Sequence, residues 1–365
     1  MFTKPFRLLA TVALLAGLFS CSRDISTGVD ANESLTPANQ IPIYWNKFTM
    51  ASTPLPKLES SVQADHIRGS LVWYNPYGQY PIKYIWPNKS FPSGAVQTQH
   101  ILSLQFSPDS AGDAPQRSWA GVMQHIEMPD TLFTNEKHLD ILLHSDPNSS
   151  GVLHIDIGRI SEDIIPNGKL DTEDKNNNDR LDEGEDVGLD GMANDDPRAL
   201  AAGGDFWDIN GNGVLDEGEP FSNDDASYNP LKPGTNGIDY SHINGTEGNR
   251  NISVTGIIPD SEDLNGNGVL DSGNDYFTVA LHLSHSHDDY GDYMVYASID
   301  KETGDDYGWR LYRIPLADMT AVGSPSRQNV ETVRLWLDGF DGETYLSIAS
   351  IELVDVEVQV IQQSP

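Results

Sequence analysis

Hydrophobic and polar residues alternate along several short segments on both sides of the middle of the chain. From Leu153 to Ile157, and again from Val333 to Leu337, every second side chain is a large aliphatic one. This period of two is typical of β-strands that bury one face. We predict strands at 139–143, 152–157, 276–283, 293–299, 309–314, 333–337 and 345–354.

These strands predict an all-β protein, because no long stretch of the sequence has a helical period. The simplest arrangement is an antiparallel β-sandwich. The strand-rich stretches 65–161 and 276–358 flank an acidic segment at 162–275. Each stretch is short for a sandwich, so we expect one domain with the acidic segment inserted at a surface loop, where a long insertion costs little closure entropy. Two independent domains would also fit the pattern, and residues 359–365 form a tail.

The N-terminal residues have the pattern of a secretory signal. Lys4 and Arg7 precede an apolar run that ends at Phe19, which is too short for a membrane span. Cys21, the only cysteine, follows L-F-S, and this resembles a bacterial lipobox. We expect cleavage of residues 1–20 and lipidation of Cys21, which would anchor the chain to the outer membrane; an ordinary signal with a nearby cysteine is the alternative. Residues 21–64 are polar and predict a tether.

The acidic segment contains three loops in which oxygen-bearing side chains recur at alternate positions. The clearest runs from Asp208 to Glu219 as D-I-N-G-N-G-V-L-D-E-G-E, which is the pattern of an EF-hand loop. Gly213 permits the turn, and Leu215 is expected to point inward. The predicted calcium ligands are Asp208, Asn210, Asn212, Val214 through its carbonyl, Asp216 and Glu219.

Two further loops follow the same pattern with one departure each. In the loop from Asp174, Asp179 replaces the turn glycine, and aspartate tolerates the left-handed backbone better than most residues. Its predicted ligands are Asp174, Asn176, Asn178, Arg180 through its carbonyl, Asp182 and Glu185. In the loop from Asp263 the closing glutamate is missing: Asn274 stands at its position with Asp275 beside it, so Asp275 is a candidate ligand and the closing ligand stays open. The other predicted ligands there are Asp263, Asn265, Asn267, Val269 through its carbonyl and Asp271.

The charge of the chain supports a structural role for Ca²⁺. The net charge is −33, and about half of the 55 acidic residues lie in 162–275. Such a segment repels itself and has too little apolar surface to fold alone, so bound Ca²⁺ would stabilise it. The loops have no flanking helices of the kind that calcium sensors use. The same acidity argues against binding to nucleic acid.

Aromatic residues crowd the stretch from Trp73 to Trp86, between prolines. Trp73, Tyr74, Tyr77 and Trp86 could form a platform for a sugar or for a protein partner. The same residues could instead pack as a strap on the sandwich, and we favour that interpretation.

Several motifs resemble the SprA family of outer-membrane proteins, which act in type IX secretion and gliding motility. They are L-V-W-Y-N-P (71–76), S-W-A-G-V-M (118–123), G-R-I-S-E-D-I (158–164), D-V-G-L-D-G (186–191), N-G-T-E-G-N (244–249), D-S-E-D-L-N (260–265) and I-A-S-I-E-L-V (348–354). The resemblance covers most of 69–354, but the chain lacks the length of a SprA translocon. The resemblance implies that the chain is one soluble module of that family, and it does not imply a translocation activity.

The strand pattern also resembles the galactose-binding-like jelly roll of many carbohydrate-binding modules. Two functions follow as expectations. The first is a non-catalytic lipoprotein module that binds or assembles with a secretion or motility apparatus, on either face of the outer membrane; the second is a glycan-binding surface lipoprotein. No sequence motif of a hydrolase, metalloprotease or nucleotide-binding enzyme occurs, so we do not expect an enzyme.

Overall fold

The computed structural model describes the sandwich and much of the acidic segment. The described residues are 39–59, 67–76, 78–92, 94–95, 97–108, 117–126, 131–145, 151–185, 187–193, 196–202, 206, 213–216, 258–283 and 293–355. Cys21, Tyr77, Asp208, Asn210, Asn212 and Glu219 lie outside them, so the expectations for these residues stay predictions.

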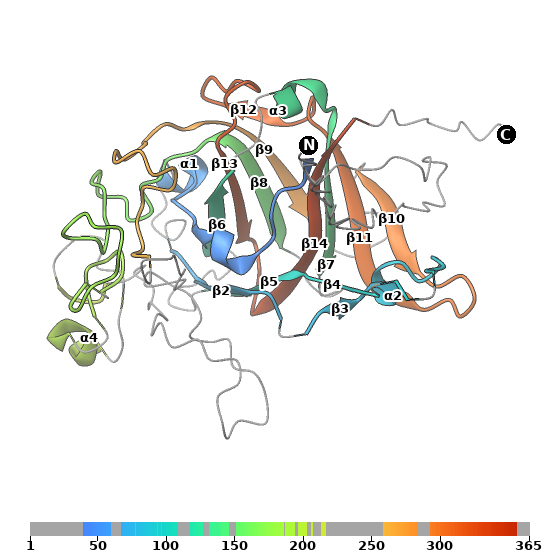
Figure 1. Ribbon diagram of the computed structural model, residues 1–365, viewed down its shortest axis with the longest axis horizontal. Coiled ribbons are helices and arrows are strands. Elements are labelled where there is room, and N and C mark those ends of the chain that lie inside the picture. Colours follow the sequence, from blue (N-terminus) through green and yellow to red (C-terminus); the bar gives the residue numbers. More distant parts are fainter. Residues whose placement is uncertain are drawn as a thin grey trace, which may run out of the picture.

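Two large antiparallel sheets form the body of the molecule (Figure 1). Sheet A, in spatial order, contains β10 (Met294–Ile299), β11 (Asp306–Pro315), β7 (His138–Ser145), β14 (Thr344–Val354), β5 (Leu102–Ser107) and β2 (Ser70–Tyr74). Sheet B contains β1 (Thr49–Met50), β6 (Trp119–His125), β13 (Thr332–Asp338), β8 (Val152–Arg159), β9 (Asp275–His282) and β12 (Thr320–Val322). All seven predicted strands are confirmed within a few residues at their ends.

The strand order is that of a jelly roll. From β5 to β8 the chain alternates between the two sheets, and after the acidic segment it continues through β9, β11, β13 and β14. The resulting orders, β5-β14-β7-β11 and β6-β13-β8-β9, are those of the two four-stranded sheets of a jelly roll. Strands from both sides of the acidic segment are neighbours in each sheet, so the two stretches build one sandwich.

The alternating pattern of the sequence fills the space between the sheets. Leu153, Ile155 and Ile157 of β8 and the aliphatic residues of β13 at alternate positions are all at most 1 % exposed. On β7, Leu139, Ile141 and Leu143 come from the facing sheet into the same core. The hydrophobic effect of this buried interior favours the sandwich.

Residues 39–59 also belong to the sandwich, which corrects part of the predicted tether. β1 pairs with β6, and Phe48 and Ala51 are buried in the main core. The short helices η2 (Trp45–Lys47) and α1 (Leu55–Leu58) lie in this segment. The polar composition concealed its packing because only a few apolar residues anchor it.

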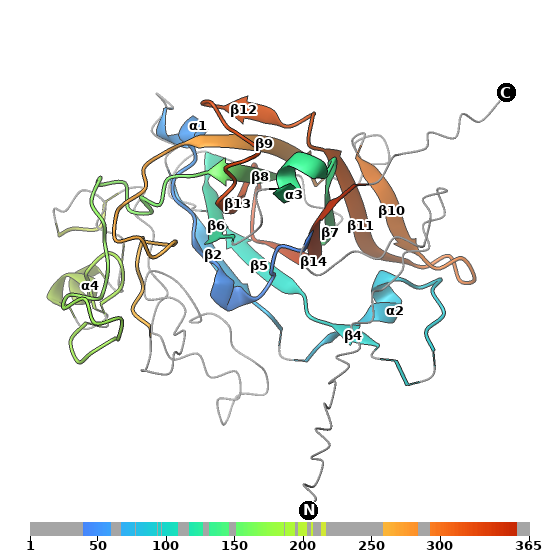
Figure 2. The ribbon, with the colours of Figure 1, turned by 45° about the horizontal axis from the view of Figure 1, so that its top comes forward.

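A strap formed by residues 78–101 covers part of the outer face of sheet A (Figure 2). It contains α2 (Ile82–Ile85) and a small sheet of β3 (Tyr80–Pro81) and β4 (Thr98–Gln99). The remaining helices are α3 (Thr131–Asn135) and α4 (Pro197–Ala202). Among the described helices none has the length and apolar character needed to cross a bilayer.

The acidic segment lies at one end of the sandwich. In Figures 1 and 2, α4 and the loops around it project on the side away from β10 and β11. The segment leaves the sandwich after β8 and returns to it at β9, and these two strands pair along their whole length. Its two ends are therefore neighbours.

Candidate functional site

The loop from Asp174 is folded around its own carboxylates. Asp174 accepts hydrogen bonds from the backbone N–H groups of Asn178 (3.0 Å) and Asp179 (2.8 Å). The amides of Asn176 and Asn178 donate to Asp182 at 3.0 and 2.8 Å. Asp179 has a φ of 57°, which confirms that aspartate adopts the left-handed conformation at the turn position.

The loop from Asp263 repeats this arrangement. Asp263 accepts from the N–H groups of Asn267 (2.9 Å) and Gly268 (2.6 Å), and the amides of Asn265 and Asn267 both donate to Asp271 at 2.8 Å. Gly268 has a φ of 78° at the turn position. Two loops about ninety residues apart in the sequence therefore have the same conformation.

The closing carboxylates of the two loops come from different places. In the Asp174 loop, Glu185 accepts from the N–H groups of Lys175 (3.1 Å) and Asp182 (2.9 Å), at the second and ninth positions. In the Asp263 loop, Glu162 accepts from the corresponding groups of Leu264 (3.2 Å) and Asp271 (3.3 Å).

Asp275, a candidate for closing the Asp263 loop, is used elsewhere. Its carboxylate accepts from the backbone of Ser324 at 2.7 Å, beside the start of β9. The closing position is taken by Glu162, which lies far earlier in the sequence.

A fourth loop, which the sequence analysis missed, begins at Asp163. Asp163 accepts from the N–H groups of Asn167 and Gly168, and the amide of Asn167 donates to Asp171 at 2.6 Å. Glu262 closes this loop by accepting from the backbone of Ile165 (2.9 Å) and Asp171 (3.0 Å).

Glu162 and Glu262 therefore exchange places. Each directly precedes one loop and closes the other. Their backbone groups follow the same reciprocal pattern. The N–H of Glu162 donates to the carbonyl of Asp271, and the N–H of Glu262 donates to the carbonyl of Asp171. Both side chains are almost fully buried, with 3 % and 0 % of their surface exposed.

The sequence carries a readable signal for this exchange. The triplets S-E-D at 161–163, T-E-D at 172–174 and S-E-D at 261–263 each precede a loop. In every triplet the hydroxyl accepts from the backbone of the aspartate two residues later, and the middle glutamate is buried. The middle glutamate of the second triplet, Glu173, accepts from Val187, Gly188 and Asp260. A buried glutamate beside a loop ligand thus marks a contact with another part of the segment.

The two exchanged carboxyls have unusual acidity. Burial, together with the nearby carboxylates of Asp271 and Asp263, raises the pKa of Glu162 to about 7, although backbone hydrogen bonds partly lower it. Burial likewise raises the pKa of Glu262 to about 7, with Asp171 and Asp163 adding to the effect. No cation among the described residues balances this pair.

The loop from Asp208 is described only at its centre. Gly213 has a φ of 76°, as its turn position requires, and Leu215 packs against a small cluster of Met192, Ala199 and Phe206. The inward position that we predicted for Leu215 is confirmed. Val214 is largely exposed.

The loops fit Ca²⁺ by the chemistry of their donors. Carboxylate, amide and main-chain oxygens are the ligands that Ca²⁺ uses in proteins, and the left-handed turn gathers them on one side of the loop. In the part of the chain that the structure describes, no group of three or more His, Cys, Asp or Glu side chains is already gathered to hold an ion.

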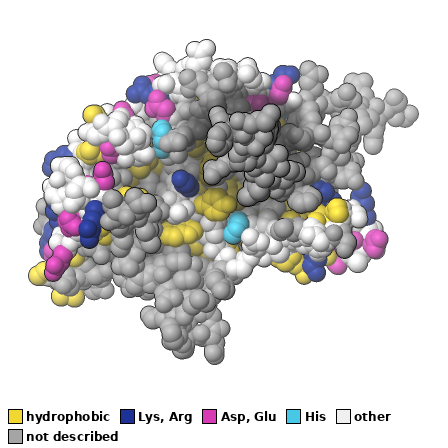
Figure 3. All heavy atoms as spheres, viewed as in Figure 1, with side chains coloured by type: hydrophobic (Ala, Val, Ile, Leu, Met, Phe, Trp, Pro, Cys, Tyr) yellow, Lys and Arg dark blue, Asp and Glu magenta, His cyan; other side chains and the backbone are white. Residues whose placement is uncertain are grey.

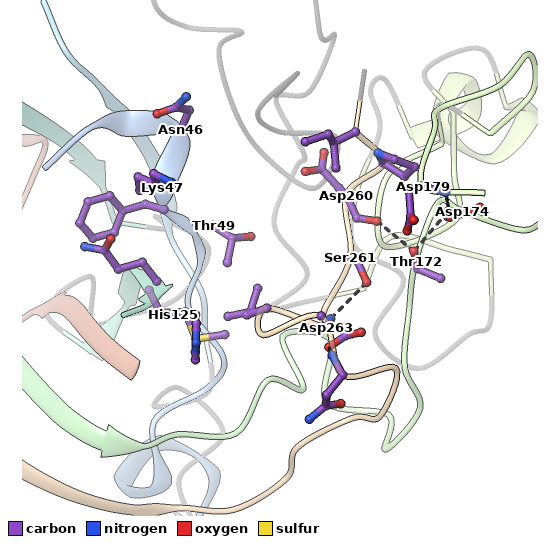
Figure 4. A pocket seen from close by; sticks show the side chains of 18 of the residues that line it. Asn46, Lys47, Thr49, His125, Thr172, Asp174, Asp179, Asp260, Ser261 and Asp263 are labelled. Atoms are coloured by element: carbon purple, nitrogen blue, oxygen red, sulfur yellow. Dashed lines mark hydrogen bonds between the residues drawn. The ribbon is translucent and has the colours of Figure 1, made fainter. Parts of the chain in front are cut away.

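A cleft of about 1010 Å³ separates the sandwich from the acidic segment (Figure 4). Its sandwich wall consists of Gln40, Pro42, Asn46, Lys47, Phe48, Thr49, Met123, Gln124, His125 and Ile126. Its loop wall consists of Leu170, Thr172, Asp174, Asn177, Asp179, Ile258, Pro259, Asp260, Ser261, Asp263, Leu264, Gly266, Asn267 and Gly268. Figure 3 shows hydrophobic side chains in the middle of the face viewed in Figure 1, with basic and histidine side chains beside them.

The described aromatic residues of 73–86 form no exposed platform, in agreement with the packed interpretation that we favoured. Trp73 is 1 % exposed and donates from its indole to the carbonyl of Trp45. Trp86 is 6 % exposed and packs on Tyr296 with ring centroids 4.5 Å apart. Tyr74 is half-buried on β2. The strap interpretation is confirmed for Trp86.

Comparisons with known proteins assign neither a family nor a ligand to this chain. No family model and no curated protein matches the sequence. Among solved structures, the chain is similar to a family 11 carbohydrate-binding module from Clostridium thermocellum in complex with a mixed-linked tetrasaccharide, with 8 % identity over 84 % of this chain and 95 % of that one, and a TM-score of 0.29. A family 11 carbohydrate-binding module of the cellulosomal cellulase Lic26A-Cel5E of Clostridium thermocellum gives 7 % identity over 84 % of this chain and 96 % of that one, and a TM-score of 0.27. These scores are too low to transfer a ligand, and the assignment of the fold rests on the strand order.

Proposed function

We propose that this chain is a non-catalytic binding module whose acidic segment is held folded by Ca²⁺. The observation that carries the proposal is the repeated loop: three described loops share the hydrogen-bonding pattern of a calcium loop, and each is closed by a carboxylate that is almost fully buried. Buried carboxylates without cationic partners are costly, and a divalent cation removes that cost.

Each loop would hold its ion through carboxylate, amide and main-chain oxygens. In the Asp174 loop these belong to Asp174, Asn176, Asn178, Asp182 and Glu185, with the carbonyl of Arg180. In the Asp263 loop they belong to Asp263, Asn265, Asn267, Asp271 and Glu162, with the carbonyl of Val269. In the Asp163 loop they belong to Asp163, Asn167, Asp171 and Glu262, with the carbonyl of Lys169. Bound Ca²⁺ would supply positive charge to the segment.

A glycan is the ligand that the cleft favours. The cleft lies beside rigid strands and is lined mainly by amide, hydroxyl and carboxylate groups, which hydrogen-bond to sugar hydroxyls. A lipid anchor at Cys21 would place this module at the outer membrane.

A second candidate function is assembly with a type IX secretion or motility apparatus. The SprA-like motifs support it, since S-E-D at 161–163 and at 261–263 belongs to two of them and builds the exchanged loops. This function requires a protein partner at the outer membrane instead of a sugar.

The test is calorimetric unfolding of the full chain in detergent, with Ca²⁺ and with chelator. We expect chelation to lower the melting temperature by more than about ten degrees, because the ions bind only the folded loops. An unchanged melting temperature would show that the loops are ordinary solvated turns, and the proposal would be wrong.

A further inference from the structure

The cleft holds hydrogen-bonding groups that have no partner among the described residues. Lys47 on η2 and His125 at the end of β6 lie on the sandwich wall (Figure 4). Across from them, Asn177 and Asp179 lie on the loop wall and are exposed. Within the described part of the chain, the side chains of these four residues take part in no ion pair or hydrogen bond.

A smaller hollow of about 500 Å³ on the outer face of sheet B differs in this respect. There His154 stacks on Trp336, and Asp338 binds both His154 and Lys57 at 3.0 Å. Its polar groups already satisfy one another, so the cleft is the better ligand site.

We propose that the cleft binds an uncharged, hydroxyl-rich ligand, namely a neutral oligosaccharide chain. A hydroxyl group both donates and accepts, so the hydroxyls of one oligosaccharide chain can bond to Lys47 on one wall and to Asp179 on the other. The volume is at the top of the range of about 300–1,000 Å³ for single drug-sized ligands, and it therefore accommodates several sugar rings. No exposed aromatic ring from the described residues lines the cleft, so hydrogen bonds supply the specificity.

The charges of the cleft exclude the other polymers. Four aspartates line the loop wall; bound Ca²⁺ would neutralise Asp174 and Asp263, which leaves Asp179 and Asp260 against one lysine on the sandwich wall. An anionic polymer would meet these carboxylates without enough compensation. A cationic peptide would suit the loop wall, but it would bring like charge against Lys47 on the opposite side.

Binding depends on Ca²⁺, and in this respect the inference rests on the proposed function. The loop wall is built from the turns of the Asp174 and Asp263 loops, including Asn177, Gly266 and Gly268. Chelation removes the ions that fix these turns, and one wall of the site is lost with them.

The experiment measures retention of the full chain, in detergent, on immobilised polymers with Ca²⁺ present. The probes are a panel of neutral polysaccharides, polygalacturonate as the anionic polymer, and polylysine as the cationic one. We expect binding to at least one neutral polysaccharide, no binding to the other two classes, and loss of binding in chelator.

Variants assign the binding to the cleft. Lys47→Ala and His125→Ala should each weaken binding by about tenfold or more, because each removes a polar contact to the ligand. Lys301→Ala and His282→Ala are matched controls, since both side chains are exposed, Lys301 lies in the turn between β10 and β11, and His282 lies at the end of sheet B opposite to His125; they should leave binding unchanged.

Each outcome separates this inference from the proposed function. If Ca²⁺ raises the melting temperature but no neutral polysaccharide is retained, or if polylysine is retained instead, the cleft assignment is wrong and the calcium proposal stands. Equal effects of the cleft and control variants would also overturn the assignment. If Ca²⁺ has no effect on stability but a neutral polysaccharide binds, the proposed function fails while the site survives.

Discussion

At the scale of single residues, the exchange of Glu162 and Glu262 is the least expected feature of the protein. Each carboxylate accepts two backbone N–H groups of a loop that lies about one hundred residues away in the sequence. Neither glutamate belongs to the loop that it directly precedes. Their positions make the two loops depend on each other, because a change in one loop moves the closing group of the other.

Replacement of either glutamate should therefore weaken Ca²⁺ binding. Glu262→Gln removes one negative oxygen ligand from the Asp163 loop, and we expect at least about a tenfold loss of affinity at one site, since charge count sets the affinity of such loops. Isothermal titration with Ca²⁺ measures it. Glu183→Gln is the control, because Glu183 is exposed and closes no described loop. Equal titrations of the two variants would contradict a ligand role for Glu262.

The same two carboxyls predict an unusual pH dependence without metal. Their pKa values of about 7 lie above the ordinary value of 4.5, so the folded chain binds more protons than the unfolded chain between these limits. Their contribution to stability is fully present below the ordinary value and is lost as the pH rises through about 7. In chelator, the melting temperature should rise when the pH falls from about 8 to about 6. The double variant Glu162→Gln/Glu262→Gln should flatten this slope, and an equally steep slope would count against these groups.

At the scale of strands, a buried polar network fixes the N-terminal segment to sheet B. Arg334 on β13 is fully buried and donates to Asp156 on β8 at 2.8 Å, while Trp336 donates to the same carboxylate at 3.0 Å. Arg334 also donates to the carbonyl of Ser52, in the segment that we predicted to be a tether. One ion pair thus connects two strands to a third part of the chain.

Removing the acid from this network should destabilise the sandwich strongly. Asp156→Ala leaves the guanidinium of Arg334 buried without its counter-charge, which costs about 3–5 kcal/mol. Urea unfolding in Ca²⁺ measures the change. Asp318→Ala removes an exposed acid near the same face and should stay within about 0.5 kcal/mol of the unchanged chain. If the two variants unfold alike, the pair contributes no net stability.

At the scale of the whole molecule, the acidic segment and the sandwich should differ in their dependence on Ca²⁺. With chelator, a protease should cut first between Glu162 and Asp260, while the strands on both sides of the cut stay together as one particle. Mass spectrometry of the fragments, after gel filtration under native conditions, measures this. Cleavage that begins within β6 or β13 would show instead that the sandwich itself needs the metal.

The sequence predicts the strands well and the contacts between distant segments poorly. Alternation locates β8 and β13 because it reflects a local period, and the loops at 174–185 and 263–274 are visible because their ligands lie within twelve residues. The closing role of Glu162 is a tertiary property: the S-E-D triplets mark both glutamates, but the spacing around Asp263 does not say which loop each glutamate closes. The packing of Phe48 was missed for the same reason, since a single aromatic residue in a polar stretch has no period.

The exchanged glutamates also hold the two ends of the acidic segment together. The bridge between Thr172 and Ser261, together with the two reciprocal carboxylates, fixes the point where the chain leaves the jelly roll to the point where it comes back. The distance between these two points is already fixed. The segment between them can therefore vary in length while the strands of both sheets keep their register. A second domain inserted between these two points would lie at one end of the sandwich, beside the cleft, without a new linker.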